Sequence, residues 1–131
     1  MYSGAKDLDT SVKFKLGKQE VTWPTPIAIA PVGVQGRVTY PDDSGDLVTC
    51  SGPTEVGVPF IVSSVSSVSL ERIAARIKEI KPESPAPWFQ VYNSIVPDVT
   101  KSMIKRAKDS GYGVSAVQCK CKCSVHTGCS I

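Results

Sequence analysis

The stretch Gly57-Val58-Pro59-Phe60-Ile61-Val62-Ser63-Ser64 decides the fold class of this sequence. A short, continuous apolar run that ends in polar residues is typical of a strand buried on both faces of a parallel sheet. The run Ile27–Ala30 precedes this stretch and Trp88–Tyr92 follows it, with a similar character. Segments with helical features separate the runs, so the chain predicts an α/β protein with right-handed parallel crossovers.

Helical spacing marks two of the intervening segments. Ser69 is the expected N-cap of the first, with Glu71 favourable in its first turn. Asp98 is the expected N-cap of the second, and Gly111 fits the position after its end. The expected inner faces are Leu70, Ile73, Ala74, Ile77 and Ile80 in the first helix, and Val99, Met103, Ile104 and Ala107 in the second.

The alternation of strands and helices along the chain also predicts a helix over Leu47–Glu55, although Gly52 and Pro53 disfavour a helix interior. At the start of the chain, polar and apolar residues alternate over Asp9–Leu16, which predicts a half-buried strand. Gly17–Glu20 reads as a turn and Val21–Trp23 as a returning strand, so this segment is expected to form a hairpin. Tyr112–Val117 predicts the last strand. We therefore divide the chain into a hairpin segment (1–25), an α/β unit (26–117) and a tail (118–131).

Composition excludes several classes of protein. The 131 residues (14.0 kDa) suit one ordinary domain, and 15 basic against 12 acidic residues give a charge of +3, too weak for a typical nucleic-acid binder. The apolar runs are shorter than the roughly 20 residues that span a bilayer. Met1–Thr10 lacks the apolar core of a secretory signal, and five cysteines are an odd number for a disulfide framework. We expect a cytoplasmic protein, without excluding a peroxisomal one; the C-terminus carries no SKL-type signal.

Four of the cysteines crowd the tail. Cys119, Cys121, Cys123, Cys129 and His126 carry the thiolates and imidazole that bind Zn²⁺ or Cu⁺. Their spacing is tighter than the usual zinc pattern, and composition changes at this point. We therefore favour a second interpretation, in which a frameshift or retained intron gives arbitrary codons, and we assign no metal site.

The carboxyl ends of parallel strands form the expected ligand-binding edge. This rule selects Pro31–Gln35, Ser63–Ser67, Gln90–Tyr92 and the residues after Val117. Gln90 lies within an apolar strand, so its amide needs partners, which either a ligand or the neighbouring backbone supplies. The serine run either lines a site or forms a solvated loop.

Four segments then resemble one family in order and with sensible spacing. Pro26–Gln35, Gly57–Ser64, Trp88–Tyr92 and Val99–Tyr112 are similar to the first four strand regions of the FMN-dependent 2-hydroxy-acid oxidases and dehydrogenases. This family includes glycolate oxidase, lactate oxidase and lactate 2-monooxygenase. The resemblance runs from about Asp7 to Val117. It implies the N-terminal half of a (β/α)8 TIM barrel, that is, three to four βα units preceded by a β-hairpin.

The resemblance also implies a cofactor, a reaction and site residues. The backbone of Val32 and Gly33 would meet the flavin of FMN, and Ser63 and Gln90 would bond to it. Tyr92 and Val65 would face the substrate, a small 2-hydroxy acid that is oxidised to a 2-oxo acid while FMN accepts the electrons. The family's catalytic histidine and arginine stand in a His-Ala-Gly-Arg motif that this sequence lacks. We assign no catalytic residue and expect these 131 residues to be inactive alone.

Two other functions stay open. An open half-barrel exposes strand edges, which a second copy or a full-length relative would cover, so the chain would serve as a binding or regulatory partner. Alternatively, the cysteine-rich tail would bind a metal on a degenerate scaffold.

Overall fold

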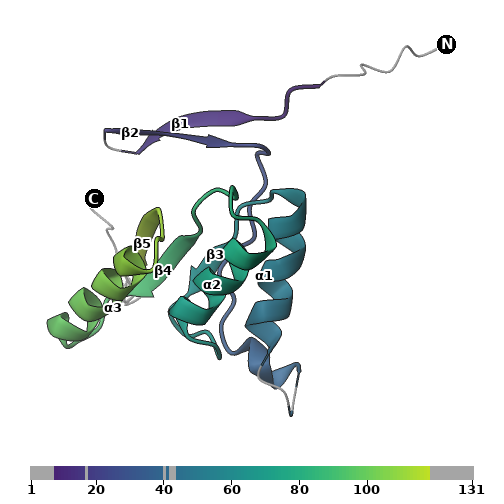
Figure 1. The fold of residues 1–131 in the computed structure, drawn as a ribbon. Coiled ribbons are helices and arrows are strands. Elements are labelled where there is room, and N and C mark those ends of the chain that lie inside the picture. The colour runs from purple at the N-terminus through teal and green to yellow at the C-terminus, as the bar shows by residue number, and fades with distance from the viewer. Residues whose placement is uncertain (1–7, 17, 40, 42–43, 119–131) are drawn as a thin grey trace, which may run out of the picture.

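The computed structural model describes residues 8–16, 18–39, 41 and 44–118 (Figure 1). The tail cysteines and His126 therefore lie outside the described residues. The elements are, in chain order, β1 (Val12–Leu16), β2 (Gln19–Trp23), the 3₁₀ turn η1 (Gln35–Arg37), α1 (Gly45–Val56), β3 (Ile61–Ser63), α2 (Leu70–Ile80), β4 (Trp88–Tyr92), α3 (Pro97–Asp109) and β5 (Val114–Gln118).

The parallel sheet follows the order β3-β4-β5, with each strand joined to the next by a helix. Ile29 adds a parallel bridge on the other side of β3: its N–H donates to Pro59 O (2.9 Å), and its carbonyl accepts from Ile61 N (3.1 Å). Neighbouring strands in chain order are thus neighbours in space, as in the wall of a β/α barrel. The predicted α/β class and its parallel crossovers are confirmed.

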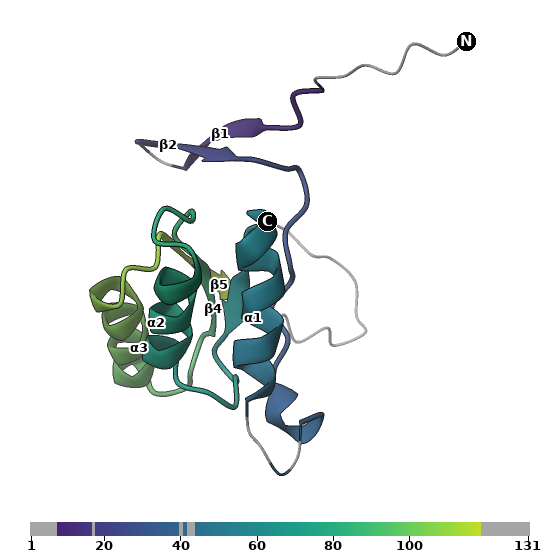
Figure 2. The same ribbon diagram turned by 45° about the vertical axis from the view of Figure 1, so that its right-hand side comes forward.

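One face of this sheet is covered by helices, which stand in front of the strands in Figure 1 and are seen from another angle in Figure 2. Helix α2 contacts both α1 and α3. The buried core between the two layers is Cys50, Phe60, Val62, Val68, Leu70, Ile73, Ala74, Ile77, Phe89, Val91, Ala107 and Tyr112. Four residues of the predicted α2 face are among them, so the helical periodicity located this contact correctly.

Strand β4 shows why the two faces of the sheet differ. Phe89 and Val91 belong to the core beneath the helices, and Phe89 meets the Tyr112 ring edge-on at a centroid distance of 5.7 Å. Side chains alternate along a strand, so Gln90 between them points to the opposite face. That face corresponds to the interior of a barrel. Gln90 is nevertheless buried, with 5% of its surface exposed.

The hairpin closes the amino end of the sheet. Phe14 and Trp23 pack on Trp88, the first residue of β4, with ring centroids 6.0 and 4.8 Å from it. The predicted hairpin is confirmed, but its turn is shorter than expected. Gln19 already pairs with Leu16, so two residues rather than four connect the strands. The binding edge at the carboxyl ends therefore lies opposite the hairpin.

Helix α1 forms over twelve residues despite its unfavourable composition. Pro53 lies in its last turn, and a Cβ added at Gly52 would meet no atom within 4 Å. Its buried residues are Gly45, Asp46, Cys50 and Thr54, so two polar side chains lie beside one core residue, Cys50. Burial raises the pKa of the Cys50 thiol to about 11, and the thiol donates to Leu47 O (3.2 Å). Tertiary contacts therefore override weak propensity here.

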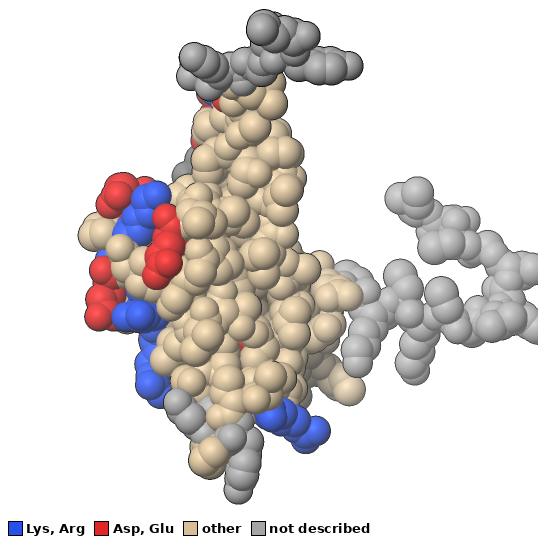
Figure 3. Space-filling view, turned by 90° about the vertical axis from the view of Figure 1, so that its right-hand side faces the viewer, with Lys and Arg blue, Asp and Glu red and all other residues tan. Residues whose placement is uncertain are grey.

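The outer surface of α1 is nearly uncharged. Figure 3 views the molecule from this side, with charged side chains gathered mainly along one margin. The helix has two charged residues, Asp46 and Glu55, and Asp46 is buried.

Three sequence expectations need correction. Helix α3 begins at Pro97 rather than after an Asp98 cap, because proline suits the first helical position, and Asp98 instead pairs with Lys101 (3.2 Å). Val99 was expected on the inner face of α3 but is 47% exposed. Ile27–Ala30 forms one bridge rather than a strand, and Ile27 is 63% exposed, because no described strand covers its outer side and the flanking prolines cannot donate hydrogen bonds.

Other expectations hold. Ser69 caps α2 by accepting from Arg72 N (3.4 Å), and Gly111 follows α3 with φ +87°. Within the part of the chain that the structure describes, no helix is long and apolar enough to cross a membrane.

Candidate functional site

The segment Pro31–Gln35 and the loop Ser63–Ser67, which we call the serine loop, lie side by side at the carboxyl edge. Val34 N donates to Val65 O (2.9 Å), and Gly36 N donates to Ser67 Oγ (2.9 Å). Two segments about thirty residues apart in the chain, each predicted from the parallel-strand rule, are therefore joined directly.

The serine loop is a partly exposed turn held by internal hydrogen bonds. Ser66 Oγ donates to Ser63 O (2.8 Å), and Ser63 Oγ accepts from Val65 N (3.2 Å). Ser63 belongs to β3 and is 6% exposed. Ser64 Oγ is buried without a hydrogen-bond partner among the described residues. An orphaned buried hydroxyl is costly, so Ser64 marks a place where an additional polar group would be stabilising.

Gln90 connects the serine loop to the last strand. Its Oε1 accepts from Ser64 N (3.4 Å), and its Nε2 donates to Gln118 Oε1 (3.1 Å). Sequence reasoning left open whether backbone or ligand satisfies this amide. In the structure one partner is backbone and the other is an exposed side chain at the end of β5. The Gln118 contact joins two side chains and is not part of the sheet's backbone hydrogen bonding.

Gly33 sits where a side chain does not fit. A Cβ at this position would collide with Cγ2 of Val65 and lie 3.3 Å from Val65 O. The next residue, Val34, has φ 57° and ψ 34°, the left-handed region that β-branched residues strongly avoid. Of the described residues it is the one non-glycine with positive φ. Such strain clusters at binding sites and persists where the surroundings enforce it.

Replacing Gly33 by alanine is expected to lower the free energy of unfolding by about 1 kcal/mol, the low end for overpacking, because half-exposed Val65 is able to turn aside. Urea unfolding followed by circular dichroism measures the change. In a chain that also carries Val65→Ala, Gly33→Ala should cost much less. An equal cost in both backgrounds would show that the Gly33–Val65 contact is not its source.

The predicted substrate-facing residues lie beside this edge. Val65 is 49% exposed at the tip of the serine loop, and Tyr92 ends β4 with 38% of its surface exposed. Val32 is 55% exposed. The six predicted site residues (Val32, Gly33, Ser63, Val65, Gln90 and Tyr92) thus all lie at the carboxyl edge of the parallel strands.

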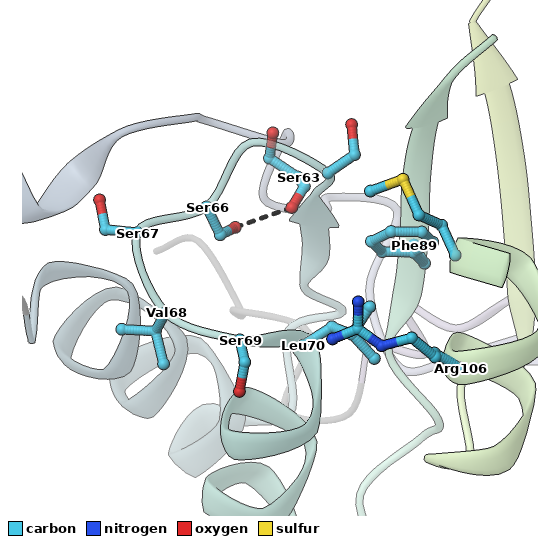
Figure 4. A pocket seen from close by; sticks show the side chains of 10 residues that line it. Ser63, Ser66, Ser67, Val68, Ser69, Leu70, Phe89 and Arg106 are labelled. Atoms are coloured by element: carbon cyan, nitrogen blue, oxygen red, sulfur yellow. Dashed lines mark hydrogen bonds between the residues drawn. The ribbon is translucent and has the colours of Figure 1, made fainter. Parts of the chain in front are cut away.

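A pocket of about 190 Å³ lies beside the serine loop (Figure 4). Its lining joins Ser63, Ser64, Ser66 and Ser67 of this loop to Phe89 and Arg106. Phe89 and Arg106 belong to the helix side of the sheet, so the pocket extends from the serine loop toward that side. Arg106 on α3 donates to both carboxylate oxygens of Glu71 (2.7 and 2.9 Å), and these hydrogen bonds hold the pKa of Glu71 below its usual value.

Three residues that shape the edge were not among the predicted site residues. Ser64 is one of five serines from Ser63 to Ser69, Val34 is a residue type that disfavours its own backbone conformation, and Asp46 belongs to no motif. Hydrogen bonds and backbone angles, not residue patterns, identify these residues. Over residues 8–16, 18–39, 41 and 44–118, no three His, Cys, Asp or Glu side chains cluster as metal ligands.

A parallel βα series with polar side chains at the strands' carboxyl ends defines part of a β/α barrel with a ligand-binding edge. The chain belongs to the FMN-dependent dehydrogenase family, whose model matches residues 1–124. It is 36% identical over 91 residues to an L-lactate oxidase of Lysinibacillus sphaericus, covering 70% of this chain and 22% of the relative. It is 36% identical over 118 residues to an FMN-dependent alpha-hydroxy acid dehydrogenase of Schizosaccharomyces pombe, covering 88% of this chain and 25% of the relative.

Solved structures agree with the family. A mandelate oxidase bound to (S)-4-hydroxymandelic acid superposes with a TM-score of 0.66 and 29% identity, over 89% of this chain and 29% of that one. Flavocytochrome b2 with bound pyruvate shares the fold, with a TM-score of 0.67. The chain spans about a quarter of the length of the curated relatives that it matches. The recognition of the family and of a partial TIM barrel is thereby confirmed.

The carboxyl edge fits a flat, hydrogen-bonding ring such as the flavin of FMN. Ser64 Oγ is an unused buried hydroxyl, and the Gln90 amide both donates and accepts at one position. These groups come from the carboxyl ends of two neighbouring strands, β3 and β4, and meet at one edge. The missing side chain at Gly33 lets Val65 of the serine loop pack directly against the backbone beside them.

Proposed function

We propose that this chain supplies the flavin-contacting wall of an FMN-dependent oxidoreductase that converts a 2-hydroxy acid to a 2-oxo acid. The observation that carries the proposal is the hydrogen-bonded connection of Val34, the serine loop and Gln90 at one carboxyl edge, in a chain of the FMN-dependent dehydrogenase family. The similarity to a lactate oxidase and to mandelate oxidase supports a small 2-hydroxy acid as the substrate class.

Each site residue has a distinct proposed role. The backbone of Val32 and Gly33 meets the flavin ring, and Ser63 and Gln90 hydrogen-bond to its polar edge. Tyr92 and Val65, both partly exposed beside that edge, face the substrate. When bound, FMN supplies the two-electron acceptor for the oxidation.

Proton removal is assigned to none of the described residues. The family resemblance places a histidine base and a carboxylate-binding arginine in a His-Ala-Gly-Arg motif, and the sequence contains no such motif. We therefore propose that these residues orient FMN and substrate but do not turn substrate over by themselves.

The test is a titration of the ¹⁵N-labelled chain with FMN, followed by NMR. Because the rest of the flavin site is missing from this sequence, we expect weak binding and no stoichiometric flavin after purification. Shifts are expected to concentrate at amides of Val32–Val34, Ser63–Val65 and Gln90–Tyr92. No oxidation of lactate, glycolate or mandelate is expected. Shifts spread over the helices, or turnover by the chain, would contradict the proposal.

Replacing Gln90 by leucine is expected to weaken FMN binding by about tenfold, because a hydrogen-bonding amide is worth about 1.4 kcal/mol at such a site. The apparent Kd from the same NMR titration measures the effect. Ser115→Ala is the matched control, since Ser115 pairs with Phe89 in register and so lies on the helix-facing side of the sheet. The control should leave the Kd unchanged. Equal weakening by both variants would place the flavin elsewhere.

A further inference from the structure

We propose that Asp46, in the first turn of α1, is a positioning residue that fixes the serine loop and, through it, the backbone around Gly33. The consequence for FMN rests on the proposed function, whereas the contacts themselves do not. Neither the family resemblance nor the sequence pattern assigned Asp46 a role.

The Asp46 carboxylate is aimed at the serine loop rather than at its own helix. Its Oδ2 accepts from Ser67 N (2.8 Å) and from Val68 N (3.3 Å), and the residue is 1% exposed. A buried carboxylate is strongly unfavourable unless hydrogen bonds stabilise it. The two loop amides meet this need, so the loop and the carboxylate stabilise each other.

The held loop in turn fixes the glycine segment. Ser67, whose N–H bonds to Asp46, accepts from Gly36 N through its Oγ (2.9 Å). Two residues earlier in the same loop, Val65 O accepts from Val34 N (2.9 Å). A change at Asp46 therefore reaches the Gly33–Val34 backbone through two hydrogen bonds, without direct contact.

A second contact from α1 supports the same segment. Thr49 Oγ1 donates to Gln35 Oε1 (2.5 Å), and Gln35 Nε2 donates to Val32 O (3.1 Å). Val34, between these anchors, has a left-handed backbone that valine does not adopt when unconstrained. The first turns of α1 thus hold both sides of a strained segment, which accounts for the buried carboxylate in this helix.

Thr54 provides the matched control within the same helix. It is also buried on this face, at 2% exposure, but its Oγ1 donates to Cys50 O of α1 itself (2.6 Å). Thr54→Val therefore perturbs the helix without touching the serine loop. Comparing Thr54→Val with a change at Asp46 therefore distinguishes a general loss of helix stability from a specific loss of loop positioning.

The test is amide hydrogen exchange, measured by NMR on the full chain without FMN. Asp46→Leu is expected to speed exchange at Ser67 and Val68 by about tenfold or more, as loss of a charge-assisted hydrogen bond implies, with smaller increases at Val34 and Gly36. Asp46→Asn keeps a carbonyl acceptor and should retain most of the protection. In Thr54→Val, the exchange rates of these four amides, each compared with the rates of the α2 amides, should equal those of the wild-type chain. The same uniform increase in Asp46→Leu and Thr54→Val would overturn the proposal.

Ser67→Ala tests the second link if Asp46→Leu does not fold. Ser67 is exposed, and this change removes only the acceptor of Gly36 N. Faster exchange at Gly36, with Ser67 and Val68 unchanged, is expected. Unchanged exchange at Gly36 would overturn the coupling between the loop and the glycine segment.

FMN titration of the same variants separates this inference from the proposed function. Asp46→Leu is expected to weaken FMN binding by about tenfold, matching its effect on the loop amides, and Thr54→Val should not. If the loop amides respond but the wild-type chain shows no FMN-induced shifts, the positioning role stands and the proposed function fails. If the amides do not respond, the positioning role fails whatever FMN does.

Discussion

Replacing Phe89 by alanine is expected to lower the free energy of unfolding by about 3–5 kcal/mol, the range found for buried Phe→Ala changes. Phe89 is 1% exposed and is among the largest fully buried side chains of the described residues. It packs against the Tyr112 ring, and the Tyr112 hydroxyl donates to Leu70 O at the start of α2 (2.8 Å). The lost ring therefore leaves a cavity where β4, α2 and the α3–β5 connection meet.

Urea unfolding followed by far-ultraviolet circular dichroism measures this loss. Ile95→Ala is the control for removing apolar atoms, because Ile95 is 100% exposed and should change stability by less than about 0.5 kcal/mol. A small effect of Phe89→Ala would mean that the sheet and helices do not pack as described.

Replacing Gly45 by alanine is expected to destabilise the chain by about 3 kcal/mol, the upper end of the range for overpacking. A Cβ at Gly45 would collide with the carbonyl oxygen of Gln35 and lie 2.6 Å from its carbonyl carbon. Backbone atoms have little freedom to retreat, in contrast with the Val65 side chain that Gly33→Ala would meet. The expected destabilisation is opposite in sign to the effect of helix propensity, which favours alanine over glycine by about 1 kcal/mol.

Gly52 supplies the opposite case in the same helix. Nothing lies within 4 Å of a Cβ built there, so Gly52→Ala is expected to stabilise the chain by about 0.5–1 kcal/mol. Thermal unfolding of both variants gives the signs. Stabilisation by Gly45→Ala would show that α1 does not press against Gln35, and would also weaken the role given to Asp46.

Residue patterns predicted the elements whose signals are local. Ser69 caps α2 and the Leu70–Ile77 face is buried because capping chemistry and helical periodicity act within a few residues. The start of α3 was misjudged because two local signals compete, and Pro97 at the first position prevails over Asp98. The predicted strand Ile27–Ala30 was wrong because its pairing with the neighbouring segment is limited to one bridge at Ile29, and pairing is a property of the sheet rather than of the run.

Part of the candidate site was likewise predicted from the sequence, and part was missed. The parallel-strand rule selected the edge, and the family resemblance selected Gly33, Ser63 and Gln90 within it. Neither pointed to Asp46, which contacts residues more than twenty positions away, or to Val34, whose conformation is set by its neighbours. Long-range hydrogen bonds leave no periodic mark in a sequence, so these residues appear only once the segments are placed in space.

The aromatic cluster of the hairpin has a practical consequence for spectroscopy. Both tryptophans of the chain, Trp23 and Trp88, belong to it, with ring centroids 4.8 Å apart. Intrinsic tryptophan emission therefore reports on the docking of the hairpin at the amino end of the strands. The carboxyl edge, at the other end of the same strands, contains no tryptophan among its described residues, so tryptophan emission does not originate there. Emission and the NMR signals of the edge thus give independent readings of the two ends of one sheet.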